Sequence, residues 1–171
     1  MMLGNVSTAA PTQYERSWAA LAHLTALLTL AVAVSTGGLA HILGLLVPLA
    51  IYVYFSNRSR YVAYHALQAT VFQALAGILY VLATVLAGAV IAVAWTVSGV
   101  LTVVLVGLLL MPLALALTLL AGMELLALPV LGLFYSVRGA YLVYHGREFD
   151  YPVVGRLVAR SMEPGRPAPG T

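Results

Sequence analysis

The sequence lacks cysteine and contains very few charged residues. Of its 171 residues, 8% are charged and 63% are hydrophobic, whereas a soluble domain carries about 25% charged residues. The chain therefore cannot cover a water-facing surface, which excludes a soluble enzyme and a free-standing nucleic-acid-binding protein. The same hydrophobicity excludes intrinsic disorder. We expect an integral membrane protein whose solvent is the lipid bilayer.

Groups of residues that carry catalysis or bind metals are also missing. The absence of cysteine excludes disulfides, thiol catalysis and iron–sulfur ligation. There is no phosphate-binding loop, nucleophile elbow, metal-binding helix motif or pair of carboxylates. His41, His65 and His145 lie near predicted helix ends, and none pairs with another at a spacing of four, so no metal site is predicted. We therefore expect no enzymatic activity.

Two apolar segments in the first third of the chain predict a helical hairpin that crosses the membrane. The first helix begins at Thr12, whose side chain fits a capping box with Glu15, and extends to about Ser35. The second runs from about Leu39 to Phe55. The uncharged Gly37-Gly38 connection is short, so the two helices are expected to be antiparallel.

A second hairpin is predicted in the long stretch from Ala66 to Phe134, which contains one charged residue, Glu124. Arginines flank both ends of this stretch, and cytoplasmic loops are the ones enriched in arginine, so the number of crossings is even. We expect two, at about Ala66–Val93 and Leu113–Val137. Residues 94–112 are expected either to extend these helices or to lie partly in the interface.

The predicted fold class is therefore all-α, with four transmembrane helices in two hairpins. The basic residues are all arginines, and the net charge of +3 is too small to indicate a nucleic-acid partner. The positions of the arginines predict that both termini lie on the cytoplasmic side of the cytoplasmic (inner) membrane. The predicted organisation is a flexible tail at 1–11, a transmembrane domain at 12–151, and a C-terminal segment at 152–171.

The C-terminal segment has an amphipathic pattern. Asp150 is expected to cap a short helix beginning near Pro152. The apolar face of this helix would contain Val154, Leu157 and Val158. The pattern is compatible with a helix lying on an anionic leaflet and equally with a frayed end. The last residues, from Glu163, are rich in proline and glycine and predict a mobile tail.

A carboxylate inside an apolar span is the most unusual feature of the sequence. An ionised and unpaired Glu124 would cost a few kcal/mol near the middle of a bilayer, so we expect it to face another helix. One interpretation is a proton or ion site, or a contact with a partner. The other is a neutral acid bonded to the backbone carbonyl that Pro129 leaves free.

Other polar residues lie at predicted membrane depth. His23 has small residues around it, and a small residue four positions before a histidine is found in polypeptides that ligate bacteriochlorophyll or haem through that histidine. Small residues more often serve close helix packing. Gln68 and Gln73 enter the third span, where they would either line a polar groove or link helices by hydrogen bonds worth about 0.6 kcal/mol each.

Three segments in order show a resemblance to a known family. They are residues 15–24 around His23, residues 61–73 around His65, and residues 146–152 from Gly146 to Pro152. Together they resemble a bacterial family of small four-helix membrane proteins of unknown function. That family is distantly related to the Tic-twenty component of the chloroplast inner-envelope import machinery. The resemblance covers about residues 14–155 and implies four spans with both ends cytoplasmic.

Three hypotheses of function follow. The first is a non-enzymatic membrane protein that acts through helix–helix contacts as an accessory or assembly subunit of a larger complex, with other subunits or itself as partners. The second is a channel or protein-translocation component, which the resemblance to the plastid protein implies. The third is a pigment- or haem-binding subunit that uses His23; without it, no cofactor is expected.

Overall fold

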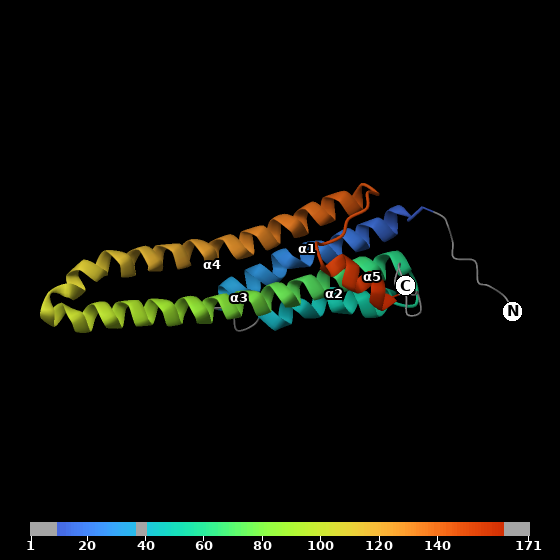
Figure 1. The fold of residues 1–171 in the computed structure, drawn as a ribbon. Coiled ribbons are helices and arrows are strands. Elements are labelled where there is room, and N and C mark those ends of the chain that lie inside the picture. The colour runs from blue at the N-terminus through green and yellow to red at the C-terminus, as the bar shows by residue number, and fades with distance from the viewer. Residues whose placement is uncertain (1–9, 37–40, 163–171) are drawn as a thin grey trace, which may run out of the picture. The chain divides into compact units, whose positions relative to one another are not determined.

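The chain is all-helical in the computed structural model, which describes residues 10–36 and 41–162. Within these two ranges there is no β-strand, which confirms the predicted all-α class. The predicted tail at residues 1–9, the Gly37-Gly38 connection and the segment from Glu163 lie outside the described residues. The helices, labelled in Figure 1, are α1 (Gln13–Ser35), α2 (His41–Phe55), α3 (Arg60–Leu101), the 3₁₀ turn η1 (Thr102–Val104), α4 (Val106–Tyr144) and α5 (Val154–Met162).

Three of these helices are long and apolar enough to cross a membrane. They are α1, α3 together with η1, and α4, while α2 is a shorter apolar helix. The chain is therefore a membrane-type helical protein, and the predicted count of four crossings stays a prediction. The capping box at the start of α1 is confirmed. The Thr12 hydroxyl accepts a hydrogen bond from the Glu15 amide, and the Glu15 carboxylate accepts one from the Thr12 amide.

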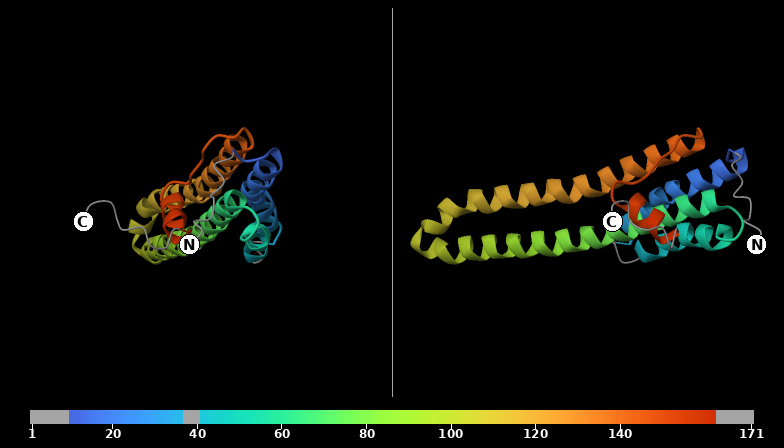
Figure 2. Two further views of the ribbon diagram at one scale, coloured as in Figure 1. Left: turned by 90° about the vertical axis from the view of Figure 1, so that its right-hand side faces the viewer. Right: turned by 45° about the vertical axis from the view of Figure 1, so that its right-hand side comes forward.

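Residues 94–112 extend the third and fourth helices, as the first of the two alternatives predicts, apart from the turn at Thr102–Leu105. α3 and α4 are 42 and 39 residues long and are joined by a tight turn (Figure 2). Leu105 reverses the chain with a φ of 63° in the left-handed region. The hydroxyl of Thr102 donates to the carbonyl oxygen of Ser98, which satisfies a backbone group in the last turn of α3.

The chain divides into two compact units, each with its own packing. The terminal unit comprises Met1–Phe72 and Tyr135–Thr171, and the hairpin unit comprises Gln73–Phe134. In the hairpin unit, the indole of Trp95 donates a 3.0 Å hydrogen bond to Thr118. Most large apolar side chains of this unit are exposed. This distribution is what a lipid-facing helical hairpin requires.

In the terminal unit, α1 and α2 pack closely at a glycine (Figure 1). Gly44 of α2 is buried against Thr29 of α1. A Cβ atom added at Gly44 would lie 2.6 Å from the Thr29 Cα atom, too close for any side chain. Two apolar helices gain most from van der Waals contact when small residues let their backbones approach in this way.

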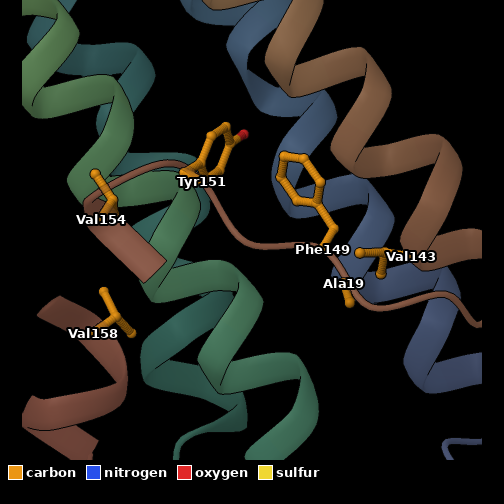
Figure 3. Close-up of a cluster of buried hydrophobic side chains, with 6 residues drawn as sticks. All are labelled: Ala19, Val143, Phe149, Tyr151, Val154 and Val158. Atoms are coloured by element: carbon orange, nitrogen blue, oxygen red, sulfur yellow. The ribbon is translucent and has the colours of Figure 1, made fainter. Parts of the chain in front are cut away.

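The C-terminal helix packs against the protein. Val154 and Val158 of α5 are buried in one cluster with Ala19 and Val143, shown in Figure 3, whereas Leu157 is 51% exposed. Because α5 is a formed helix, the alternative of a frayed end is wrong. The placement of this helix on a leaflet stays a prediction, and part of its apolar face is covered by the protein itself. The sequence pattern showed an apolar face but could not show what covers it.

Asp150 does not cap this helix as predicted. α5 begins at Val154, two residues beyond Pro152, so its cap position lies three residues after Asp150. The Asp150 carboxylate instead accepts hydrogen bonds from Tyr64 and Gln68 of α3.

We predict that Gly44→Ala lowers the stability of the protein by about 1–3 kcal/mol, because the added methyl group forces α1 and α2 apart. Gly88→Ala is the matched control, since Gly88 is also helical and has open space where its Cβ would lie. That control should be neutral or stabilising by up to about 1 kcal/mol. Thermal unfolding in detergent, followed by circular dichroism, measures both. Equal effects of the two substitutions would contradict the close packing at Gly44.

Candidate functional site

A glycine turn after α4 directs the chain into the core of the terminal unit. Gly146 has a φ of +74°. Its amide donates a 3.0 Å hydrogen bond to the carbonyl oxygen of Val143, and the amide of Arg147 donates a 2.9 Å hydrogen bond to the carbonyl oxygen of Leu142. This pair of bonds is the Schellman motif, which needs a left-handed residue at the position of Gly146. The turn explains why a glycine stands at this position of the sequence pattern.

The segment after the turn inserts two aromatic rings among the helices (Figure 3). Phe149 lies against Gly139, where an added Cβ would overlap its ring, and meets the His23 ring edge-on at 5.4 Å. Tyr151 stacks on Phe72 with ring centroids 3.9 Å apart. Tyr151 is 1% exposed, so its ring is a core side chain even though it lies on a loop.

A chain of hydrogen bonds runs through the buried side chains around Tyr151. The Tyr151 hydroxyl lies 3.0 Å from Nδ1 of His23 and donates a 3.2 Å bond to Oγ of Ser136. Nε2 of His23 lies 3.3 Å from Nδ1 of His65. We call His23, His65, Gln68, Ser136 and Tyr151 the buried polar cluster, because all five are buried.

The donors and acceptors of this cluster are compatible with one continuous chain of hydrogen bonds. With the Tyr151 hydroxyl donating to Ser136, the Tyr151 oxygen can accept a hydrogen bond from the Nδ1–H tautomer of His23. In that neutral tautomer Nε2 of His23 is an acceptor for a hydrogen bond from Nδ1 of His65. Burial raises the pKa of Tyr151, against the opposite effect of the Ser136 hydrogen bond, so its phenol keeps the proton.

Gln68 connects the cluster to the backbone of the returning segment. Its Oε1 accepts a 3.2 Å bond from the amide of Tyr151, and its Nε2 donates a 2.7 Å bond to Oδ1 of Asp150. The hydroxyl of Tyr64 donates to the same oxygen of Asp150 at 2.8 Å. A buried amide without partners costs about 1–3 kcal/mol. Because the oxygen and the nitrogen of the Gln68 amide both bond to residues 150 and 151, these two residues are strongly favoured in one position.

The segment also contains local strain. Val153 has a φ of 69°, and the amide of Val154 bonds to the carbonyl oxygen of Pro152, which makes a γ-turn. A β-branched residue at positive φ costs on the order of 1–3 kcal/mol and persists only when its surroundings hold it. Tyr151 before the turn and Val154 after it are both buried, and they hold it.

The arrangement suits holding a segment in place better than ligating a group. Both ring nitrogens of His23 lie within hydrogen-bonding distance of a neighbouring side chain, so an axial bond to a haem or pigment would break one of these contacts. Within residues 10–36 and 41–162, no group of three histidines, aspartates or glutamates is placed to hold a metal ion. What the cluster does chemically is pair the hydroxyl and the amide of Tyr151, which the segment buries.

Some of the predicted site residues come together here and others do not. His23, His65 and Gln68 are in the buried polar cluster, and Gly146 and Pro152 frame the segment that enters it. Gln73 is buried too, but it belongs to the hairpin unit.

Glu124 also belongs to the hairpin unit, where its side chain is exposed. Whether it faces another helix in the membrane stays a prediction. The residues of α4 near Glu124 are apolar on every side of the helix. The sequence therefore could not indicate in which direction the Glu124 side chain points.

Sequence reasoning missed Ser136 altogether, and it missed the roles of Phe149, Asp150 and Tyr151. Ser136 was one small polar residue in an apolar helix, and such residues usually bond to their own helix. A usable signal was the pair of aromatics alternating along the polar stretch after Gly146. Their spacing places both rings on the same side of an extended segment.

Comparison with known proteins identifies the family. A model of the magnetosome magnetite crystal formation protein family (MamF/MmsF) matches residues 14–158. The chain belongs to this family. The match includes the whole buried polar cluster, from His23 to Tyr151. No match was found among curated proteins or among solved structures.

The family assignment corrects the resemblance to the Tic-twenty-like proteins, which is wrong. The three segments that suggested it contain what any protein needs to build this cluster: a small residue beside a buried histidine, a histidine and glutamine on one helix, and a glycine turn before Tyr-Pro. Such requirements identify a packing solution and not a family. The channel or translocation hypothesis rested on that resemblance and loses its support.

We predict that Tyr151→Phe destabilises the protein by about 1–3 kcal/mol, because it leaves the stacked ring in place and removes its contacts with His23 and Ser136. Tyr144→Phe is the matched control. Tyr144 is exposed, so its change should stay within about 0.5 kcal/mol. Thermal unfolding in detergent measures the difference. A Tyr151→Phe variant as stable as the control would contradict the role of the cluster.

Proposed function

We propose that this protein is a non-enzymatic accessory protein of the magnetosome membrane, where it supports the formation of magnetite crystals through contacts with other membrane subunits. The match of the family model to residues 14–158 carries this proposal, because it takes in both units and not one motif. The absence of catalytic motifs from the sequence supports a role that depends on contacts.

The two units suit different parts of such a role. The terminal unit presents its exposed polar residues Arg147, Glu148 and Asp150 on a segment that the buried polar cluster holds in place. The hairpin unit offers helix faces to lipid and to other helices. Gly88, Gly99, Gly122 and Gly132 all have open space beside them, which supports close approach by a helix of a partner.

Glu124 supports contact with a partner subunit. It is exposed on the apolar hairpin unit and has no hydrogen bond or ion pair within the described residues. A carboxylate facing lipid costs a few kcal/mol, so in the membrane a polar group from another chain should meet it. This is the partner contact that the first interpretation of Glu124 includes.

We further propose that all four of α1 to α4 cross the membrane, with both termini on the cytoplasmic side. α2 has 15 residues, about 22 Å, and would cross with the help of the polar residues around Ser56 and local thinning of the bilayer. The arginines from Arg58 onwards lie in segments assigned to the cytoplasm, whereas the turn at Thr102–Leu105 has none.

The natural absence of cysteine makes this topology directly testable. In sealed magnetosome vesicles, whose outer face is cytoplasmic, a membrane-impermeant maleimide should label Asn57→Cys and Arg160→Cys. It should label Val103→Cys only after detergent is added. All three positions are exposed, so access depends on the side of the membrane. Labelling of Val103→Cys in sealed vesicles, or protection of Arg160→Cys, would rule out four crossings.

The function itself is tested by deleting the gene in a magnetite-forming bacterium and measuring crystals by electron microscopy. We expect smaller or fewer crystals, restored by the wild-type gene and by Tyr144→Phe. Protein abundance is measured in each strain, so that loss of the protein is separated from loss of its activity. Crystals of unchanged number and size in the deletion strain would contradict the proposal.

A further inference from the structure

A pocket in the terminal unit has features that no part of the proposed function uses. It has a volume of about 310 Å³ and lies where α1 begins and α2 ends. Its lining comes from the first turn of α1, with Tyr14 and Glu15, and from the end of α2 and the turn that follows it. We call it the α1–α2 pocket.

An acid and a base line this pocket without neutralising each other. Oε1 of Glu15 accepts a 2.7 Å bond from Ser59, and Oε2 accepts bonds from the amide and hydroxyl of Thr12. Arg58 donates a 2.8 Å bond to the Tyr54 hydroxyl. The Arg58 guanidinium also lies over the Tyr54 ring, 4.2 Å from its centroid. Within the described residues, no ion pair joins Glu15 to Arg58, so the two charges line the pocket separately.

Neither charged group has used its full capacity for hydrogen bonds. A carboxylate accepts about four hydrogen bonds, and Glu15 accepts three. A guanidinium donates five, and Arg58 donates one. One acceptor position for a cation and several donors for an anion therefore line the same pocket.

Aromatic side chains form one wall of the pocket. Tyr14, Tyr54 and Phe55 line it, with the Tyr54 and Phe55 ring centroids 4.9 Å apart. Trp18, which is not part of the lining, contacts Tyr14 and Phe55. Aromatic faces attract ammonium groups. Trp and Tyr also gather where a membrane helix meets the lipid headgroups, and the apolar stretches of α1 and α2 lie next to this wall along the chain.

We propose that the α1–α2 pocket binds the headgroup of a zwitterionic phospholipid that has a primary amine, such as phosphatidylethanolamine. The amine lies against Glu15 and the aromatic faces, and the phosphate lies against Arg58. The pocket discriminates by charge. An anionic headgroup such as phosphoglycerol satisfies Arg58 but places no cation against Glu15.

Native mass spectrometry of the full-length protein, released from detergent with added lipid, tests the proposal. The probes are phosphatidylethanolamine and phosphatidylglycerol with the same acyl chains. We expect retention of phosphatidylethanolamine to exceed that of phosphatidylglycerol by roughly tenfold, as one hydrogen bond between charged groups provides. Glu15→Gln and Arg58→Gln should each remove most of this preference.

Both variants are chosen to leave the fold intact. Glutamine serves in a capping box as glutamate does, so Glu15→Gln removes the charge and keeps the cap of α1. Arg58 is exposed on a turn, so its variant tests the pocket even where Glu15→Gln lowers stability. Arg156→Gln is the control, since Arg156 is an exposed arginine of α5 outside the pocket, and it should keep the full preference.

Equal retention of the two lipids, or a preference that survives both Glu15→Gln and Arg58→Gln, would overturn the proposal. Loss of the preference in Arg156→Gln would overturn it too, because net charge and not the pocket would then decide. Free phosphoethanolamine distinguishes the source of the headgroup. If it displaces the lipid at equal concentration, the pocket serves a soluble compound, and the assignment to a lipid is wrong.

Discussion

The hydrogen bond between His23 and Tyr151 joins residues that are 128 positions apart in the sequence. It holds the segment after α4 in the core of the terminal unit, and the packing of that unit depends on this position of the segment. His23 comes from α1, His65 from α3 and Ser136 from α4, and Tyr151 belongs to the returning segment. One phenol ring therefore ties together elements from both ends of the chain. Polar groups buried this deeply are costly unless each is paired, so alternative positions of the segment are disfavoured more strongly than apolar packing alone would achieve.

The consequences of this interaction extend along the segment on both sides of Tyr151. Gly146 turns the chain so that Phe149 and Tyr151 enter the core. The strained γ-turn at Val153 then directs α5 onto the hydrophobic cluster to which both rings belong. Burial of Val154 and Val158 completes the unit. The match to the magnetosome family covers residues 14–158 and therefore includes this whole construction.

The parts of the fold that depend on local sequence were predictable, and the parts that depend on distant pairing were not. Apolar composition predicted membrane helices, and the Thr12 and Glu15 pair predicted the start of α1. His23 and Gln68 were identified as unusual, but their partners lie far away in sequence: Tyr151 is 83 positions from Gln68. For Glu124 and Leu157 the sequence showed the residue and its helix but not the direction in which each side chain points.

Amide hydrogen exchange at Tyr151 tests the central claim most directly, because this amide lies on a loop and is bonded only to the side chain of Gln68. The account predicts that the Tyr151 amide of the wild-type protein exchanges as slowly as amides inside α1. In Gln68→Leu it should exchange at least about tenfold faster, as the loss of about 1.4 kcal/mol of protection implies. A wild-type Tyr151 amide that exchanges as fast as an unstructured loop would show that the segment is not held, and would contradict the account.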